Sequence, residues 1–200
     1  MTGSSTAEKQ NLRREKLLAR SLLAPEYRKS ADMSIRLKLE ALPEYRNAAV
    51  IAAYAGDGTE PDLIPLLRKA GAEGKTICFP RWNKQDSRYE MAFADAAFTL
   101  VEGKWKLPEP PEEASAAPES ILKNALWLIP GVAFDPNCGR LGRGKGIYDR
   151  FLSRSGGFAA GIFYDCQMTA ALPMEPHDRY LDLVVTESAL YRRVEPLMKN

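Results

Sequence analysis

Apolar residues follow two patterns along this chain, one typical of helices and one of buried strands. Residues 8–23 and 26–42 hold apolar side chains at every third or fourth position, which predicts amphipathic helices. Pro25 begins the second helix and Pro43 ends it. Short uninterrupted apolar runs predict strands buried on both faces of a parallel sheet. These runs lie at residues 48–54, 75–80, 125–129, 158–164 and 181–186.

One β-α-β unit is indicated by the turn residues that end its apolar runs. The first apolar run ends at Ala-Gly-Asp-Gly, residues 55–58. Thr59 then caps a helix, with Asp62 three residues later, that ends at Gly71 or Gly74. A second strand follows, so the order predicts parallel strands joined by a right-handed crossover. We therefore expect an α/β fold, a single-domain three-layer sandwich whose mostly parallel central sheet is flanked by helices.

Less regular segments complete the expected domain. Residues 89–94 and 97–101 are shorter strand candidates, which predict an antiparallel extension of the sheet. Residues 102–118 are rich in Pro and Glu and are expected to form an ordered surface loop. Residues 1–8 are expected to be a disordered leader, which leaves residues 9–200 as one domain.

Composition narrows the function classes. The chain of 200 residues has a net charge of only +2, so no general nucleic-acid-binding surface is indicated. Its apolar runs are shorter than the roughly 20 residues that a membrane span needs, and no signal peptide is seen. We expect a cytoplasmic monomer without nucleic-acid or membrane partners.

Cysteine and histidine usage excludes several kinds of site. Cys78, Cys138 and Cys166 form no Cys-x-x-Cys pattern; Cys78 is expected in the core and Cys138 at the surface. His177 is the single histidine of the sequence, which argues against multi-histidine metal sites and against Ser-His-Asp chemistry.

The segment from residue 139 to residue 148 carries the clearest chemical signal. Glycine adopts positive φ at little cost, and successive backbone amides with Lys and Arg form a cradle for phosphate. The spacing is neither that of the P-loop nor that of the dinucleotide-binding motif. The plain alternative is a flexible basic surface loop, but its place after an apolar strand and before a helix at residues 147–155 favours a ligand site. Its glycines and cations are Gly139, Arg140, Gly142, Arg143, Gly144, Lys145 and Gly146.

Several motifs together resemble one known family. They are PGVAFD followed by GRLGRGKGIYDRFL, the Lys-x-x-x-Arg of the first helix, Phe-Pro-Arg at residues 79–81, and LPxExHD…D…VTE near the end. The chain resembles the 5-formyltetrahydrofolate cyclo-ligases, also called methenyltetrahydrofolate synthetases, over residues 9 to 190. The resemblance implies an ATP-dependent ring closure, in which 5-formyltetrahydrofolate and MgATP give 5,10-methenyltetrahydrofolate, ADP and phosphate.

The same resemblance implies the nucleotide contacts. Lys9 and Arg13, which by pattern alone lie on a solvated charged face, match residues that contact ATP, and Arg81 matches a motif near the nucleotide. Lys145, Arg143 and Tyr148 are the catalytic candidates. The whole Gly-rich block is expected to bind ATP: Gly139, Arg140, Leu141, Gly142, Arg143, Gly144, Lys145, Gly146, Ile147 and Tyr148.

Folate and metal contacts follow in the same way. Asp149 and Asp182 are the expected Mg²⁺ ligands, although Asp149 also suits a helix cap or an ion pair with Arg150. Two positions depart from the family pattern: Ile147 replaces an aromatic residue, and Pro61 replaces an aliphatic one. The expected folate contacts, with or without a polyglutamate tail on the substrate, are Glu60, Tyr54, Trp105 and Tyr148.

Two other functions stay open at this stage. One is an ATP-dependent ligase or kinase on the same scaffold with a non-folate substrate, which the departure at Ile147 allows. The other is a nucleotide- or RNA-binding module without catalysis. The small net charge and the lack of interleaved aromatic residues argue against the RNA-binding module.

Overall fold

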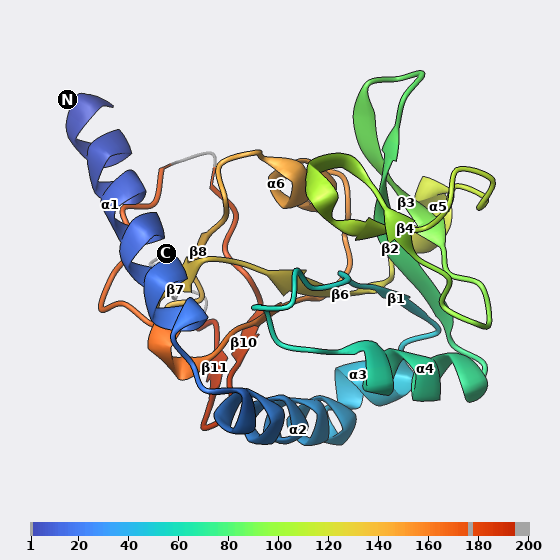
Figure 1. Ribbon diagram of the computed structural model, residues 1–200, viewed down its shortest axis with the longest axis horizontal. Helices are drawn as coiled ribbons and strands as arrows, with labels where there is room; N and C mark the ends of the chain where they lie inside the picture. The colour runs from blue at the N-terminus through green and yellow to red at the C-terminus, as the bar shows by residue number, and fades with distance from the viewer. Residues whose placement is uncertain (1, 176–177, 195–200) are drawn as a thin grey trace, which may run out of the picture.

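A computed structural model of the chain describes residues 2–175 and 178–194 as three layers around one sheet (Figure 1). The strands run in the order β11-β10-β9-β6-β1-β2-β3. The five inner strands are parallel, whereas β3 and β11 pair antiparallel at the two edges. The bounds are β1 Val50–Ala52, β2 Thr76–Asn83, β3 Arg88–Phe93, β6 Leu126–Pro130, β9 Ala159–Ile162, β10 Leu183–Val185 and β11 Leu190–Arg192. The expected mostly parallel α/β sandwich is confirmed.

Helices cover both faces of this sheet (Figure 1). One face carries α2 (Pro25–Ala41), α3 (Pro43–Asn47) and α4 (Ile64–Ala72), and the other carries α5 (Glu119–Leu122) and α6 (Ile147–Leu152). Helix α1 (Thr2–Ser21) packs at the end of the domain against β7 and η2. The remaining elements are β4 Val101–Glu102, η1 Lys104–Lys106, β5 Pro108–Glu109, β7 Ala133–Phe134, β8 Arg140–Leu141 and η2 Asp165–Gln167.

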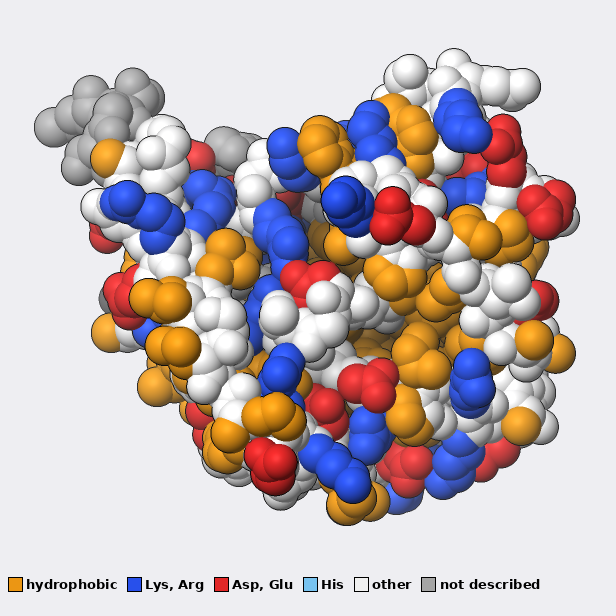
Figure 2. Space-filling model, viewed as in Figure 1, with side chains coloured by type: hydrophobic (Ala, Val, Ile, Leu, Met, Phe, Trp, Pro, Cys, Tyr) orange, Lys and Arg blue, Asp and Glu red, His pale blue; other side chains and the backbone are white. Residues whose placement is uncertain are grey.

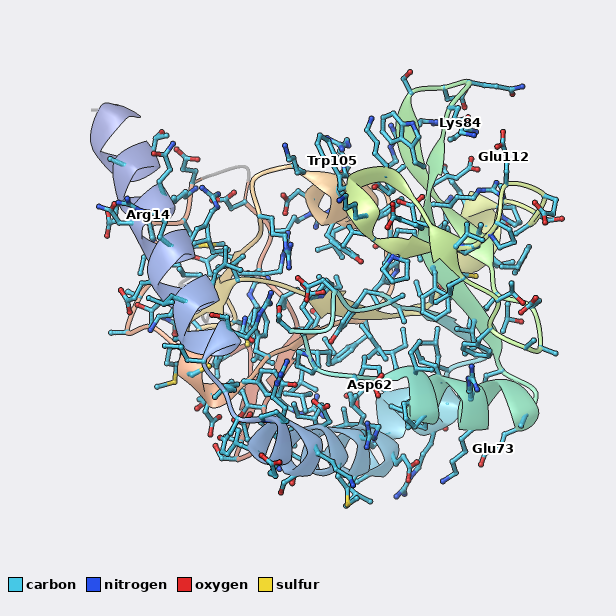
Figure 3. All side chains as sticks on the ribbon, in the orientation of Figure 1. Arg14, Asp62, Glu73, Lys84, Trp105 and Glu112 are labelled. Carbon is cyan, nitrogen blue, oxygen red and sulfur yellow. The ribbon has the colours of Figure 1, made fainter. Side chains whose placement is uncertain are left out.

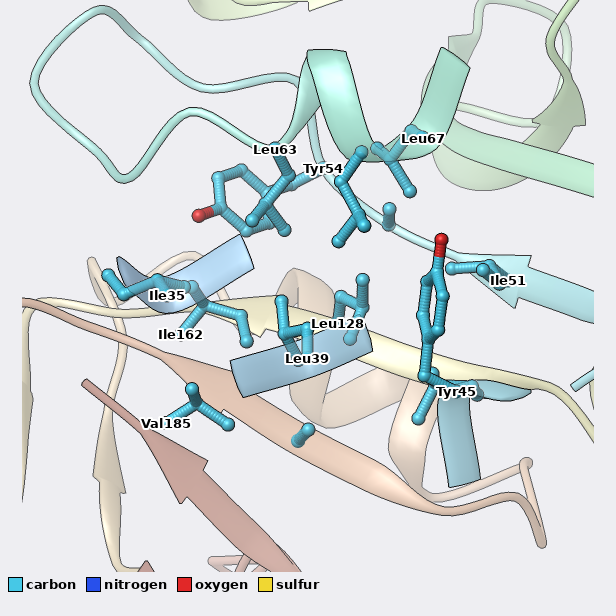
Figure 4. Close-up of a cluster of buried hydrophobic side chains, with 14 of the residues drawn as sticks. Ile35, Leu39, Tyr45, Ile51, Tyr54, Leu63, Leu67, Leu128, Ile162 and Val185 are labelled. Carbon is cyan, nitrogen blue, oxygen red and sulfur yellow. The ribbon is translucent and has the colours of Figure 1, made fainter. Parts of the chain in front are cut away.

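Alternation along the buried strands builds two cores. In β6, Leu128 faces the α2–α4 side and Trp127 faces the α5–α6 side, because successive side chains of a strand point to opposite faces. Figure 4 shows the first core, in which Leu39 of α2 lies beside the sheet residue Leu128, and Leu67 of α4 belongs to the same cluster as Ile51 of β1. This burial on both faces explains why the strands read as uninterrupted apolar runs.

Several local expectations need correction. Helix α1 begins at Thr2, so residues 2–8 continue the helix and do not form the expected leader. Thr59 is not a helix cap: it donates to the Asp57 carboxylate, and α4 begins later, where Asp62 accepts from the N–H of Ile64 at 2.9 Å. The 97–101 segment does not extend the central sheet, because only its last residue lies in a strand, and that strand, β4, pairs with β5 in a separate two-stranded sheet.

The parallel strands end at one common edge of the sheet, and this edge forms the site. The chain leaves β1 at Ala52 and reaches Tyr54, and it leaves β6 at Pro130. Asp182 precedes β10 and therefore lies at the opposite edge. Within the described part of the chain, no helix has both the length and the apolarity to cross a membrane.

Candidate functional site

The main pocket lies at the carboxyl edge of the sheet, beneath the Gly-rich loop. It is formed by this loop, the segment after β1, and Trp105 from the loop between β4 and β5. Figure 2 shows the hollow between the α1 and α6 sides of the molecule, with Lys and Arg side chains along it. The residues that line it are Tyr54, Ala55, Glu60, Trp105, Leu107, Pro130, Gly131, Arg140, Gly142, Arg143, Gly144, Lys145, Gly146, Ile147, Tyr148 and Asp149.

Two glycines give the loop its shape. Gly144 has φ +84° and Gly146 has φ +64°, a region in which side chains are strained, so the expected positive φ is confirmed at both. Gly146 is also the residue before α6. Arg13 of α1 fastens the loop from outside, because its Nε donates to the carbonyl of Gly142 at 2.8 Å.

A side cavity opens on the α1 flank of the main pocket. Lys9 and Arg13 line it, and it shares Arg140, Gly142, Gly144 and Asp149 with the main pocket. Residues of the first helix and of the Gly-rich loop therefore line one common cavity. Leu141 lines this cavity as well, whereas Ile147 lines the main pocket.

Lys9 lines this cavity and forms ion pairs with two acidic side chains. Its Nζ lies 2.9 Å from a carboxylate oxygen of Glu175 and 2.8 Å from one of Asp178. Burial disfavours its charge, but these two partners outweigh burial and raise the pKa of Lys9. His177, which belongs to the same sequence motif, lies outside the described residues.

Lys145 is placed differently from the other cations of the loop. Its Nζ lies 4.2 Å from the centre of the Trp105 ring, and it has no ion pair in residues 2–175 and 178–194. Trp105 itself is 55% exposed, has φ +64°, and lies beside α6 (Figure 3). Lys145 is therefore available to an anion that enters the pocket.

Arg143 belongs to a network of four charges. It pairs with Asp57, and its Nη2 lies 3.4 Å from a carboxylate oxygen of Glu60. Arg20, at the end of α1 and 1% exposed, reaches the same two carboxylates at 3.4 and 3.6 Å. The two arginines hold Glu60 with its carboxylate at the wall of the pocket.

The two carboxyl groups of this network titrate in opposite directions. Burial raises the pKa of Glu60, the negative charge of Asp57 adds to the effect, and both arginines only reduce it. Burial opposes the charge of Asp57 too, but hydrogen bonds from Thr59 and the charge of Arg143 outweigh it and lower the pKa to about 2. Glu60 is thus the more easily protonated member of the pair.

Two tyrosines form the aromatic wall of the pocket. The Tyr54 hydroxyl donates to the carbonyl of Pro61 at 2.8 Å, so its polar end is already used. The Tyr148 hydroxyl has no hydrogen bond partner in the described ranges. Burial raises the pKa of Tyr148, and the charge of Glu60 adds to it, so the phenol stays protonated.

Asp149 is paired with Arg140 at the junction of the two cavities. Arg140 also donates to the carbonyl of Pro130 at 3.3 Å, and its side chain is 4% exposed, whereas that of Asp149 is 49% exposed. Asp149 can thus offer a carboxylate oxygen to the pocket. Within the described ranges, no group of three or more His, Cys, Asp or Glu residues could hold a metal ion.

Three expected site residues do not reach either cavity. Arg81 donates to the carbonyls of Pro111 and Glu112 and so anchors the 102–118 loop. The Asp182 carboxylate accepts from the N–H of Ala159 at 2.7 Å, at the edge of the sheet away from the pocket. Gly139 closes a turn on the side chain of Asp135.

Cys138 also differs from its expected place. It is fully buried, and its Sγ lies 3.1 Å from the carbonyl oxygen of Tyr191. It does not lie at the surface, because β11, a strand that the sequence did not predict, passes over it.

Two residues of the network were missed by the sequence analysis. Arg20 reads as one more charged residue of an amphipathic helix, and Asp57 reads as part of a turn. A signal for Asp57 existed in the sequence, since Asp in a Gly-rich turn is typical of a side chain that accepts from the backbone N–H two residues later. No local signal exists for Arg20, because its partners lie on another segment.

Comparisons with known proteins agree on one family. The model of the 5-formyltetrahydrofolate cyclo-ligase family matches residues 5–187. A 5-formyltetrahydrofolate cyclo-ligase of Mus musculus is 26% identical over 192 residues, which cover 90% of this chain and 94% of that protein. One of Mycolicibacterium smegmatis is 30% identical over 141 residues, which cover 68% and 72%. The NMR structure of Aquifex aeolicus 5,10-methenyltetrahydrofolate synthetase has a TM-score of 0.82 and 29% identity and covers 96% of both chains. The chain belongs to the 5-formyltetrahydrofolate cyclo-ligase family.

Proposed function

We propose that this protein converts 5-formyltetrahydrofolate to 5,10-methenyltetrahydrofolate at the expense of ATP. The observation that carries the proposal is the main pocket together with its side cavity. In this space, a cationic Gly-rich loop faces an aromatic wall that carries a carboxylate. The loop suits a triphosphate, and the wall suits a flat heterocycle with hydrogen-bond donors.

The loop side is assigned to the nucleotide. Lys145 meets the terminal phosphates, since it has no ion pair within the described ranges and needs only to leave the face of Trp105. Arg143 and Arg140 add charge, and the N–H groups of Gly144 and Gly146 add hydrogen bonds. Lys9 and Arg13 approach the same phosphates from the side cavity.

The opposite side is assigned to the folate. Glu60 offers an acceptor to the donors of the pterin ring, and the two arginines behind it fix its direction. Tyr54, Trp105 and Tyr148 give the flat surfaces against which aromatic rings pack. This arrangement holds the formyl group between the loop and the wall.

The reaction requires positioning more than a protein nucleophile. The γ-phosphoryl group passes from ATP to the formyl oxygen, which converts a poor leaving group into a phosphate ester. N10 of the folate attacks the formyl carbon and loses its proton, which closes the ring. The bond between the formyl carbon and the phosphorylated oxygen then breaks, and phosphate leaves with the electron pair of that bond. Lys145 and Arg143 stabilise the charge that develops on the transferred group, and Tyr148 can donate its hydroxyl proton in a hydrogen bond there.

Magnesium is part of the proposal, and Asp149 would hold it. Mg²⁺ usually takes one or two protein carboxylates together with phosphate oxygens and waters. Asp149 fits this need at the junction of the two cavities, with Arg140 fixing its orientation. The ion supplies charge neutralisation of the phosphates when it is bound. Asp182 is not assigned to it.

One experiment tests the function directly. The purified protein is mixed with MgATP and 5-formyltetrahydrofolate, and the near-ultraviolet absorbance of the methenyl product is followed together with ADP. Equal amounts of ADP and methenyl product are expected. ADP release with another acceptor and no methenyl product would favour a different ligase or kinase. No ADP under any condition would favour a binding module.

A cytoplasmic monomer is the state that we propose for the enzyme. All three cysteines are unpaired thiols, which suits a reducing compartment. Light scattering of the purified protein tests the monomer, because an assembly would double the measured mass or raise it further.

A further inference from the structure

Arg143 lies between the two halves of the main pocket and has two possible sets of negative partners. In the free protein its guanidinium pairs with Asp57 and Glu60 on the folate side. The residue itself belongs to the Gly-rich loop, where it is assigned to the phosphates of ATP. One positive charge is thus shared between the two substrate sites.

Both carboxylate oxygens of Glu60 are engaged before a ligand binds. Oε1 lies 3.4 Å from Nη2 of Arg143 and 3.6 Å from Nη1 of Arg20. Oε2 accepts from the N–H of Asp57 at 3.3 Å. A hydrogen-bond donor of the pterin that approaches from the pocket therefore competes with these protein donors for Glu60.

Of the two arginines, Arg143 is the one that can leave Glu60. Its side chain is 42% exposed, and the next residue, Gly144, has φ +84°. The side chain of Arg20 is 1% exposed, and its Nη1 also donates to the carbonyl of Gly131 at 3.2 Å. Burial and this additional partner fix Arg20, whereas solvent and a neighbouring glycine leave Arg143 room to turn.

The folate side keeps its shape when Arg143 turns away. Oδ1 of Asp57 accepts from the N–H and the hydroxyl of Thr59 at 2.9 and 2.7 Å, and from the N–H of Glu60 at 3.1 Å. Arg20 remains 3.4 Å from the other oxygen of Asp57. The charge of the network changes, because two carboxylates then face one arginine and carry a net charge of −1.

We propose that Arg143 couples the two substrate sites: ATP draws its guanidinium away from Glu60, and the folate binds to the carboxylate that this movement opens. The inference rests on the proposed function. Folate that arrives first meets a carboxylate that Arg143 still occupies, so ATP raises the affinity for the folate. The coupling is reciprocal, since two ligands that share one equilibrium change each other's affinity by the same factor.

The test measures equilibrium binding without turnover. Calorimetry gives the Kd of 5-formyltetrahydrofolate with and without a saturating, non-hydrolysable ATP analogue and Mg²⁺, at pH 8 to favour the ionised form of Glu60. The Kd of the folate should be about tenfold lower with the analogue. The Kd of the analogue should fall by the same factor when the folate saturates the protein.

Two variants assign this coupling to Arg143. Arg143→Ala should reduce the effect of the analogue on the folate Kd to less than about twofold. Asp57→Asn keeps Arg143 and the oxygen that closes the turn, but removes the charge that holds the guanidinium on the folate side. Each ligand measured alone should then bind about threefold more tightly, whereas a merely structural role of Asp57 would weaken both.

A matched control separates the coupling from a general change in charge. Arg68→Ala removes an exposed arginine of α4 that lines neither the main pocket nor the side cavity. This variant should keep the tenfold coupling of the unsubstituted protein.

The outcomes distinguish the inference from the function on which it rests. Equal folate Kd values with and without the analogue, coupling that survives in Arg143→Ala, or weaker binding of both ligands to Asp57→Asn would each overturn the coupling alone. Absence of folate binding and of methenyl product in the unsubstituted protein would overturn the proposed function instead.

Discussion

Replacing Lys145 by alanine removes the cation that the proposed phosphate site most depends on. Two other cations of the loop form ion pairs with carboxylates of the protein. Arg143 pairs with Asp57 and Glu60, and Arg140 pairs with Asp149. Lys145, by contrast, has no ion pair in the part of the chain that the structure describes, and its Nζ lies 4.2 Å from the centre of the Trp105 ring. The variant should therefore lose catalysis while it keeps the fold.

The expected magnitude follows from the contact that Lys145 would make. A cation about 4 Å from a phosphate charge gains about 4 kcal/mol at an effective dielectric constant of about 20. Desolvation of the exposed ammonium offsets part of this, so about 2.7 kcal/mol is expected to be lost, which is a decrease in kcat/KM of about 100-fold. The cation–π contact contributes only about 0.5–1 kcal/mol to folding, so Tm should fall by less than about 4 °C.

The assay is methenyl formation under steady-state conditions, with thermal unfolding followed in parallel. Lys84→Ala is the matched control, because Lys84 is an exposed lysine paired with Glu112, on the turn between β2 and β3 away from Trp105 (Figure 3). It should leave kcat/KM unchanged. Activity of Lys145→Ala within about threefold of the unsubstituted protein would refute the assignment, since no transition-state contact of that strength would then exist.

Three further predictions follow from the pocket. Glu60→Gln should raise KM for the folate about tenfold and leave KM for ATP nearly unchanged, because the amide puts a donor where the pterin needs an acceptor. A change in KM for ATP alone would contradict the assignment. Asp149→Asn should raise the Mg²⁺ concentration for half-maximal activity several-fold, and an unchanged titration would remove Asp149 from the metal site. Asp57, with a pKa of about 2 in place of its usual 3.8, stabilises the fold above pH ~4 and loses this contribution of about 2 kcal/mol as the pH falls toward 2. Chemical unfolding at several pH values should show a smaller loss between pH ~4 and ~2 for Asp57→Asn than for the unsubstituted protein, and equal losses would count against the lowered pKa.

Features that depend on neighbouring residues were predicted well from the sequence. The positive φ values of Gly144 and Gly146 follow from glycine itself, and both are present. The apolar runs became the five parallel strands, because a strand buried on both faces has no polar positions to display. The strand at 125–129 proved central, between β1 and β9.

Errors arose where a residue's role depends on distant segments. Arg81 and Asp182 both belong to recognisable motifs, yet Arg81 anchors a loop and Asp182 lies at the wrong edge of the sheet. In a parallel sheet, a residue before a strand and a residue after it are separated by the strand's full length. The sequence motif alone did not distinguish these two places.

The sequence by itself determined the family and the α/β class, and it singled out the loop to which we assign phosphate binding, since each depends on local residue order. The tertiary structure alone decided which charged groups are engaged in ion pairs within the protein and which are available to a ligand. Arg20 and Asp57 became a support for Glu60 only because α1 packs across the end of the sheet, and Lys145 stayed without an ion pair in the described chain because no carboxylate was folded against it. Charge pairing acts through space over a few ångströms, and those distances are fixed only when all layers are packed together.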